Sequence, residues 1–300
     1  MYRLAHVTDP HFRSFEGAHL GDFLGKRAVG ALNLVVNRRR HHKMELLAAL
    51  GEDLRHQPLD HVALTGDLSN VSLEAEWREA LRWIGETNQA PDALTVIPGN
   101  HDAYVAEVVK SRVFETLFAP FQSSDLPALP ERYPFVRFRG PLALVAINSC
   151  VATGDLGAWG EIGAAQLARL EGVLTSPALA DRTRVVLLHH PPVQLKGGED
   201  RNLKDRAAFS ATLARAGAEL ILHGHDHRDE TATLPGPDGQ AIPVVGAGSA
   251  SYAGSAEKRA RYNIYEFEGA ARRANITRVT RAHQEERDAF AEVRREPLSS

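Results

Sequence analysis

The chain has 300 residues, a length that suits one or two domains and can hold a single large α/β domain. A hydrophobic fraction of 43% and a charged fraction of 24% are ordinary globular values, which excludes a disordered or fibrous chain. The formal net charge is −3, from 35 basic and 38 acidic residues, and gives no case for a nucleic-acid partner.

The numbers of cysteines and histidines indicate which compartment and which type of metal ligand to expect. The single cysteine, Cys150, cannot form an intrachain disulfide or a cysteine-based zinc site, and it favours the reducing cytoplasm. No apolar run is long enough to span a membrane, and the N-terminus lacks a signal-peptide pattern. With 14 histidines beside one cysteine, any bound metal is expected to be held through nitrogen and oxygen.

The first three quarters of the chain alternate between short apolar runs, which predict strands, and helical periodicity. Strands are predicted at 4–8, 61–65, 94–97, 135–138, 142–147, 185–188 and 220–222. Helices are predicted at 44–55, 73–86, 105–118, 164–174 and 205–216. Residues 119–134 contain four prolines and predict a loop.

Beyond residue 225 the pattern changes to consecutive strands, at 231–234, 242–245, 263–267 and 275–279, with no helix between them. Alternation followed by a run of strands predicts a layered α/β fold with at least one mixed or antiparallel sheet, and two sheets packed face to face with helices outside would suit that order. No segment resembles a linker, so a single domain over residues 1–280 is favoured over two. The charged tail at 281–300 is expected to fray.

Five loops that follow predicted strands carry residue types that bind metal ions. They are Asp9-Pro10-His11, Gly66-Asp67, Gly99-Asn100-His101-Asp102, His189-His190-Pro191-Pro192 and Gly224-His225-Asp226-His227. Ligands of open α/β sheets bind outside the carboxyl ends of the strands, so one edge is expected to gather all five loops. Their Asp, His and Asn side chains are the ligands expected for Mn, Fe or Zn.

The spacing within these loops is compatible with shared ions. In an extended backbone, side chains i and i+2 point the same way, so Asp9 and His11 are expected to grip one ion, and His225 and His227 likewise. Asp67 can bridge two ions with its two oxygens. Two divalent ions would leave the centre positive, attract a phosphate oxygen and lower the pKa of a bound water.

Each loop taken singly also has an ordinary structural explanation. Asp9 alone could be a turn residue, Gly66-Asp67 is a common pair, and a buried His189 could be a packed, hydrogen-bonded histidine. The Asn-His-Asp and His-x-His groups are stronger signals. Five such loops at successive strand ends favour a metal centre over coincidence.

Together these motifs resemble the calcineurin-like metallophosphoesterase superfamily, over about three quarters of the chain. The resemblance implies a four-layer α/β/β/α sandwich with a dinuclear metal centre. It implies that the first ion is held by Asp9, His11, Asp67 and His227, and the second by Asp67, Asn100, His189 and His225. The His-x-Pro spacing of the family selects His189 over the adjacent His190.

Within the superfamily the chain is most similar to bacterial class III cyclic nucleotide phosphodiesterases and glycerophosphodiesterases. The similarity lies in size and in the segment from Asn148 to Leu167, although that group more often has Asp where Asn148 stands. It implies hydrolysis of cyclic nucleotides or small phosphodiesters by a hydroxide that lies between the ions and attacks phosphorus. His101 is expected to bind the phosphate or protonate the leaving oxygen, and Asp102 to orient the His101 ring.

Residues 23–43 combine an apolar helical stripe with several basic side chains. The plain interpretation is a surface helix; the sharper one is that residues 15–43 form a cap or rim that steers anionic substrates or touches anionic lipid. The lipid interpretation suggests an alternative function, a pyrophosphohydrolase for a nucleotide-linked lipid. A non-catalytic binding scaffold is the alternative of another class, and the complete ligand set argues against it. The sequence leaves the oligomeric state open.

Overall fold

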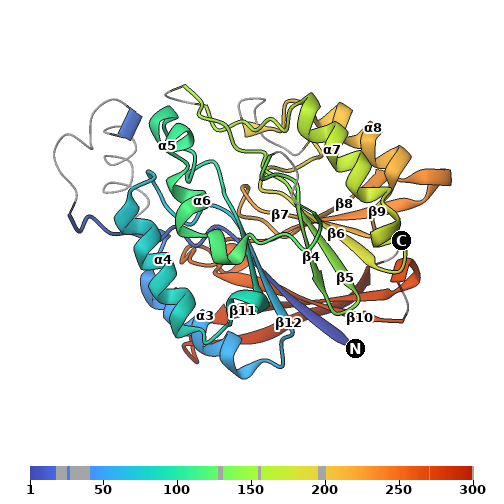
Figure 1. The fold of residues 1–300 in the computed structure, drawn as a ribbon. Helices are drawn as coiled ribbons and strands as arrows, with labels where there is room; N and C mark the ends of the chain where they lie inside the picture. The colour runs from blue at the N-terminus through green and yellow to red at the C-terminus, as the bar shows by residue number, and fades with distance from the viewer. Residues whose placement is uncertain are drawn as a thin grey trace.

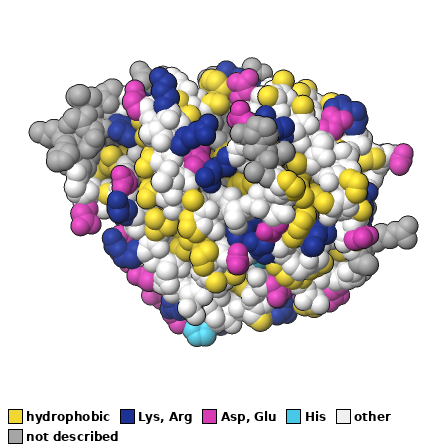
Figure 2. All heavy atoms as spheres, viewed as in Figure 1, with side chains coloured by type: hydrophobic (Ala, Val, Ile, Leu, Met, Phe, Trp, Pro, Cys, Tyr) yellow, Lys and Arg dark blue, Asp and Glu magenta, His cyan; other side chains and the backbone are white. Residues whose placement is uncertain are grey.

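Two six-stranded sheets lie face to face in the computed structural model, with helices on their outer faces (Figure 1). The structure describes residues 1–17, 26–27, 41–127, 131–154, 157–194, 201–269 and 271–298. Most of the segment 23–43 lies outside these residues. On the face drawn in Figure 2, basic and acidic side chains are interspersed, in keeping with the nearly balanced charge. None of the helices in the described ranges has the length and apolar character needed to cross a membrane.

The first sheet has the strand order β12-β11-β10-β1-β2-β3. Its strands are β1 (Tyr2–Val7), β2 (His61–Thr65), β3 (Leu94–Ile97), β10 (Arg261–Glu268), β11 (Asn275–Gln284) and β12 (Ala289–Leu298). Strands β1, β2 and β3 run parallel, whereas β10 pairs antiparallel with β1. The outer face is covered by α3 (Met44–His56), α4 (Glu74–Glu86), α5 (Ala106–Ser111) and α6 (Val113–Leu117).

The second sheet has the order β4-β5-β6-β7-β9-β8. Its strands are β4 (Phe135–Arg139), β5 (Leu142–Ala146), β6 (Thr183–Leu187), β7 (Leu220–His223), β8 (Glu230–Pro235) and β9 (Ala241–Gly246). Its outer face is covered by α7 (Ala164–Leu174) and α8 (Arg206–Ala216). Short 3₁₀ helices lie at Pro91–Ala93, Ala119–Phe121, Pro177–Leu179, Pro237–Gly239, Ala256–Lys258 and Ala271–Arg273.

A third core lies between the sheets. Leu4 and Ala63 of the first sheet pack there with Leu144, Leu187 and Leu222 of the second. Because helices cover the other face of each sheet, the parallel strands are buried on both faces over most of their length and are mostly apolar in the sequence. The layers are therefore helix, sheet, sheet and helix, which confirms the predicted fold class.

Two expectations about secondary structure were wrong. The helix predicted at 105–118 is two helices, α5 and α6, because Arg112 between them adopts a left-handed conformation with a φ of 53°. The tail beyond residue 280 does not fray: β11 continues to Gln284, and β12 pairs with it along its whole length. The tail is held because the Arg281 guanidinium donates two hydrogen bonds of 2.7 Å to Asp53 and Phe290 is buried in the core.

Two buried histidines predict that acid destabilises the fold. His6 and His61 are fully buried, each bonded through Nε2 to a threonine hydroxyl at 2.8 Å. Burial lowers the pKa of each from 6.5 to about 3. The unfolded chain therefore takes up both protons near pH 6.5 and the folded chain only near pH 3, so stability is lost as pH falls through that window. Each pKa unit of this difference is worth about 1.4 kcal/mol.

The variant His61→Gln should flatten this dependence, because glutamine can bond Thr95 without titrating. The free energy of unfolding, measured by urea titration between pH 7.5 and 5, should fall less in this variant than in the wild type. A parallel measurement on His56→Gln, a substitution of an exposed histidine on α3, should follow the wild-type curve. Identical slopes for all three proteins would remove His61 as a source of the acid sensitivity.

Candidate metal centre

The five predicted loops meet where the carboxyl ends of strands from both sheets converge. Asp9, Asp67 and Asn100 follow β1, β2 and β3, whereas His189 follows β6 and His225 follows β7. Backbone hydrogen bonds tie neighbouring loops together: Asp9 donates to the Gly66 carbonyl at 3.1 Å, and Gly224 donates to the His189 carbonyl at 3.1 Å. The site is therefore built on strand ends that the two packed sheets hold in place.

The first group of ligand atoms comprises Asp9, His11, Asp67 and His227, all within 4.8 Å of one another. The Nε2 atoms of His11 and His227 lie 3.1 Å apart. Asp9 Oδ1 is 3.2 Å from Nε2 of His227, and Asp67 Oδ2 is 3.8 Å from Nε2 of His11. Two carboxylates and two imidazoles thus converge on one point.

The second group comprises Asp67, His189 and His225, also within 4.8 Å of one another. The amide oxygen of Asn100 joins it, 3.1 Å from Nε2 of His189 and 2.8 Å from Nδ1 of His225. Asp67 Oδ1 lies 3.4 Å from Nε2 of His189, while its Oδ2 faces the first group. Asp67 therefore stands between the two groups with one oxygen toward each.

The chemistry of these atoms fits metal ions. Asp9 Oδ1 is buried and has no hydrogen-bond partner among the described residues, although it faces two imidazole nitrogens. A buried carboxylate oxygen without a hydrogen-bond partner destabilises the fold, and a cation between this oxygen and the nitrogens would remove that penalty. A donor set of imidazole nitrogens with carboxylate and amide oxygens suits Mn, Fe or Zn.

Charges within the site keep the bridging carboxylate ionised. Burial raises the pKa of Asp67, but the imidazoles of His189 and His101 outweigh burial and hold that pKa well below its usual value. Burial lowers the pKa of His189, whereas the Asp67 carboxylate raises it, to about 9 overall. A metal ion that binds His189 must displace a proton, so metal uptake is coupled to proton release.

The local backbone differs from the extended conformation expected for Asp-x-His and His-x-His. Five site residues have a φ between 50° and 76°: Asp9, His11, Asp67, His225 and His227. Non-glycine residues rarely adopt this left-handed region, and clusters of them occur at functional sites. As a result His225 and His227 do not point at one ion as expected; His227 joins the first group and His225 the second.

Two glycines permit close approach between these loops. A Cβ atom on Gly99 would collide with the backbone nitrogen and the carboxylate of Asp67. A Cβ atom on Gly224 would collide with the hydroxyl of Thr8, and it would also meet Oδ2 of Asp9. Any side chain at these positions would displace a carboxylate of the site.

The structure changes the expected role of Asp102. His101 donates from Nδ1 to the Asn70 carbonyl at 2.6 Å, so this carbonyl orients the ring. The Asp102 carboxylate instead accepts hydrogen bonds from the backbone of Leu68, Ser69 and Gly99, the hydroxyl of Ser69 and the indole of Trp77. Asp102 therefore braces the loops that carry Asp67 and His101 and does not hold the imidazole itself.

The adjacent histidines His189 and His190 have different surroundings in the structure. His189 groups with Asp67 and His225, whereas the adjacent His190 bonds the hydroxyl of Ser149 at 2.8 Å through Nδ1. Burial lowers the pKa of His190 to about 3, so it packs as a neutral ring.

The sequence analysis missed His42, which belongs to a third group of possible ligand atoms, with His11 and His227. No motif or strand end marks it.

The fold resembles those of two solved phosphatases. A dimetal phosphatase from Danio rerio aligns with a TM-score of 0.60 and 12% identity, covering 97% of this chain and 98% of that one. The purple acid phosphatase PPD1 of yellow lupin aligns with a TM-score of 0.56 and 14% identity, covering 94% of this chain and 51% of that one. At such low identity the likeness concerns the fold alone. No curated protein matches the sequence.

A match to a family model establishes the family of the chain, which the similarity in fold alone does not. Residues 2–229 match the model described as calcineurin-like phosphoesterase, a span that includes every residue of the two ligand groups. The shared Asp67 and the nitrogen and oxygen donors on either side form a centre for two divalent metal ions. The chain therefore belongs to the calcineurin-like phosphoesterase family and is a metal-dependent phosphoester hydrolase.

Proposed function

We propose that this enzyme hydrolyses small phosphodiesters, cyclic nucleotides among them, as do the class III phosphodiesterases that the sequence resembles. The observation that carries the proposal is the half-buried ring of Tyr104, which stacks on His101 beside the first ligand group; a second half-buried ring, Trp159, follows a residue whose carbonyl lies near the second group. Each has a lysine ammonium on its face. Aromatic faces with nearby cations suit the base and phosphate of a nucleotide.

Tyr104 lies on the side of the first ligand group. The His101 ring is 5.2 Å from the His11 ring, and Tyr104 stacks on His101 with 5.5 Å between the ring centroids. Lys26 Nζ lies 4.4 Å from the Tyr104 centroid and donates hydrogen bonds to Thr153. This side therefore presents an aromatic ring and a positive charge next to His101.

The backbone that precedes Trp159 lies on the side of the second ligand group. The carbonyl of the preceding residue, Ala158, is 3.2 Å from Nε2 of His190, whose ring is 4.7 Å from that of His225. The ammonium of the exposed Lys204 is 3.2 Å from the Trp159 centroid. The chain around Trp159 therefore brings a second aromatic ring with a cation on its face to the neighbourhood of the second group.

The proposed chemistry follows from these positions. We assign Asp9, His11, Asp67 and His227 to one ion, and Asp67, Asn100, His189 and His225 to the other. Two such ions supply Lewis acidity to the phosphate and to the attacking water. The carbonyl of Asn70 fixes the proton on Nδ1 of His101, so the imidazolium form can give its Nε2 proton to the leaving oxygen.

The alternative of a nucleotide-linked lipid pyrophosphohydrolase rests on residues 23–43 as a cap or lipid-binding segment. Of these, the structure describes Lys26, Arg27 and residues 41–43, and the expected apolar stripe lies outside the described residues. The described part supports substrate binding only through Lys26. The diester proposal is preferred on the Tyr104 ring beside His101.

Replacing Tyr104 with alanine should raise KM for 3′,5′-cyclic AMP, which has a single base, by about 5- to 150-fold, because base stacking on an aromatic ring is worth about 1–3 kcal/mol. Trp159→Ala should raise it less. KM for methyl 4-nitrophenyl phosphate, a diester without a base, should change much less. Steady-state kinetics with added Mn²⁺ measure both. Tyr2→Ala, at the opposite end of β1, is the matched control.

The same assay decides the substrate class. Higher kcat/KM for these diesters than for 4-nitrophenyl phosphate, a monoester, supports the proposal. Preference for the monoester or for a nucleotide-linked lipid would overturn it. Equal losses on both diesters in the aromatic variants would show that the rings maintain the site and do not bind a base.

A further inference from the structure

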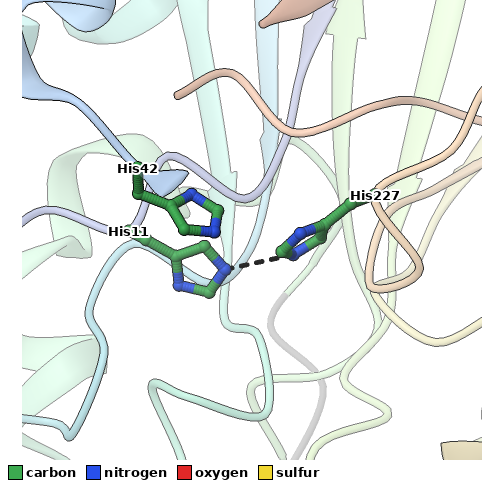
Figure 3. Close-up of side chains that lie close together, drawn as sticks. All are labelled: His11, His42 and His227. Atoms are coloured by element: carbon green, nitrogen blue, oxygen red, sulfur yellow. Dashed lines mark hydrogen bonds between the residues drawn. The ribbon is translucent and has the colours of Figure 1, made fainter. Parts of the chain in front are cut away.

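His42 lies at the first ligand group although it belongs to none of the five loops. Its ring is 4.8 Å from the ring of His11 and 5.4 Å from that of His227, edge-on to both. The ligand nitrogens of the three residues all lie within 4.8 Å of one another. Figure 3 shows the three rings converging, with a nitrogen of His42 turned toward the other two.

The distances suit coordination of one ion by all three rings. Nitrogens bound to a single ion at about 2.1 Å each are separated by at most about 4.2 Å. The observed nitrogens, within 4.8 Å of one another, therefore need to contract around a cation by up to about 0.6 Å where two are trans and by more where they are cis. His42 is also buried, with 4% of its surface exposed, so its nitrogen faces the site and not bulk water.

The other nitrogen of His42 is already engaged. Nδ1 lies 2.8 Å from the hydroxyl of the buried Ser251. Metal-ligating histidines nearly always bond through their second ring nitrogen, which fixes the tautomer and the direction of the ring. With Nδ1 bonded to Ser251, Nε2 is the nitrogen presented to His11 and His227.

The segment that holds His42 also holds a predicted ligand. His42 forms a β-bridge with Tyr252, and the backbone nitrogen of Lys43 donates to the Ser251 carbonyl at 3.0 Å. Two residues earlier in the chain, the hydroxyl of Ser249 donates to the Asp9 carbonyl at 2.7 Å. One short segment thus fixes His42 and the Asp9 loop relative to each other.

We propose that His42 is a third imidazole ligand of the first metal ion, with Ser251 as its positioning residue. The proposal depends on the assignment of Asp9, His11, Asp67 and His227 to that ion. It gives the first ion three nitrogen donors, against two for the second. Imidazole favours Co and Zn relative to Mn, so the two positions differ in metal preference.

The test is metal binding by the variant His42→Phe, which keeps an aromatic ring against His11 and His227 but removes the nitrogen. His41→Phe is the matched control, because His41 is the adjacent, exposed histidine. Calorimetric titration of the metal-free protein with Mn²⁺ and Co²⁺ gives the affinity of each equivalent. The Co²⁺ absorption spectrum reports the ligands of the first ion.

In His42→Phe one of the two equivalents should weaken by at least about 100-fold, more for Co²⁺ than for Mn²⁺, and the Co²⁺ spectrum should change. Ser251→Ala, which retains the imidazole, should weaken the same equivalent by about 10-fold, the usual lower cost of losing such a supporting hydrogen bond. This second variant keeps the proposal testable if His42→Phe folds poorly. Affinities and spectra equal to those of His41→Phe would overturn the role of His42.

A further variant separates this proposal from the ligand assignment beneath it. Asp9→Asn should weaken the first equivalent whether or not His42 is a ligand. Loss of that equivalent in Asp9→Asn but not in His42→Phe or Ser251→Ala would refute the role of His42 alone. Unchanged binding in Asp9→Asn would refute the assignment of the first ion.

Discussion

Replacing Asp67 with alanine is expected to abolish phosphoester hydrolysis and to remove both metal equivalents, because among the described residues this side chain is the one that both ligand groups share. Oδ2 lies 3.8 Å from Nε2 of His11, and Oδ1 lies 3.4 Å from Nε2 of His189. Without it each group loses an anionic oxygen and the remaining cationic charge is less well balanced. Elemental analysis after dialysis and a diesterase assay with added Mn²⁺ measure the two effects.

The fold should survive the change, which circular dichroism and thermal unfolding can verify. Asp67 has a φ of 54°, and asparagine tolerates this region better than alanine, so Asp67→Asn is the gentler companion variant. Asp181→Ala, an exposed position before β6, should behave as wild type. Full activity or full metal occupancy in Asp67→Ala would contradict the dinuclear assignment.

Much of the fold could be predicted because burial leaves a strong trace in the sequence. Strands β2, β3 and β6 are buried at every position. They are therefore apolar or uncharged along their length, except for Arg184 of β6, which pairs with Glu219. Helix α7 was predicted with its observed bounds, because its apolar spacing matches a single buried face. These patterns depend on neighbouring positions alone.

The elements that could not be predicted depend on contacts between residues far apart in the chain. Strand β12 is mostly exposed and rich in arginine and glutamate, so nothing in its own residues predicts a strand. It forms because β11 offers an edge and because Arg281 reaches Asp53, 228 residues earlier in the chain. Such long-range contacts are invisible to periodicity.

In the candidate site too, one part could be predicted from the sequence and another could not. Strand ends could be located, so Asp9, Asp67, Asn100, His189 and His225 could be predicted to meet. The left-handed conformations could not be predicted, because they depend on hydrogen bonds between loops, such as that from the backbone nitrogen of His11 to the Asp67 carbonyl. They occur at Asp9, His11, Asp67, His225 and His227. His42 was missed because its partner Ser251 lies 209 residues away.

Replacing His101 with alanine is expected to lower kcat by about 10²- to 10⁴-fold on diesters with poor leaving groups, the usual range for general acid catalysis. The ring is fixed by the Asn70 carbonyl and lies beside His11, outside both ligand groups. It can therefore protonate a departing alkoxide without holding metal. A 4-nitrophenolate leaving group needs no proton, so its release should slow far less.

The comparison of leaving groups is what gives this prediction its force. An acid acts only where the departing oxygen is basic, whereas a group that binds phosphate slows both substrates alike. Metal content should equal that of wild type and of His56→Ala, which changes an exposed histidine on α3. Equal rate losses on both substrates would assign His101 to phosphate binding, and loss of metal would place it among the ligands.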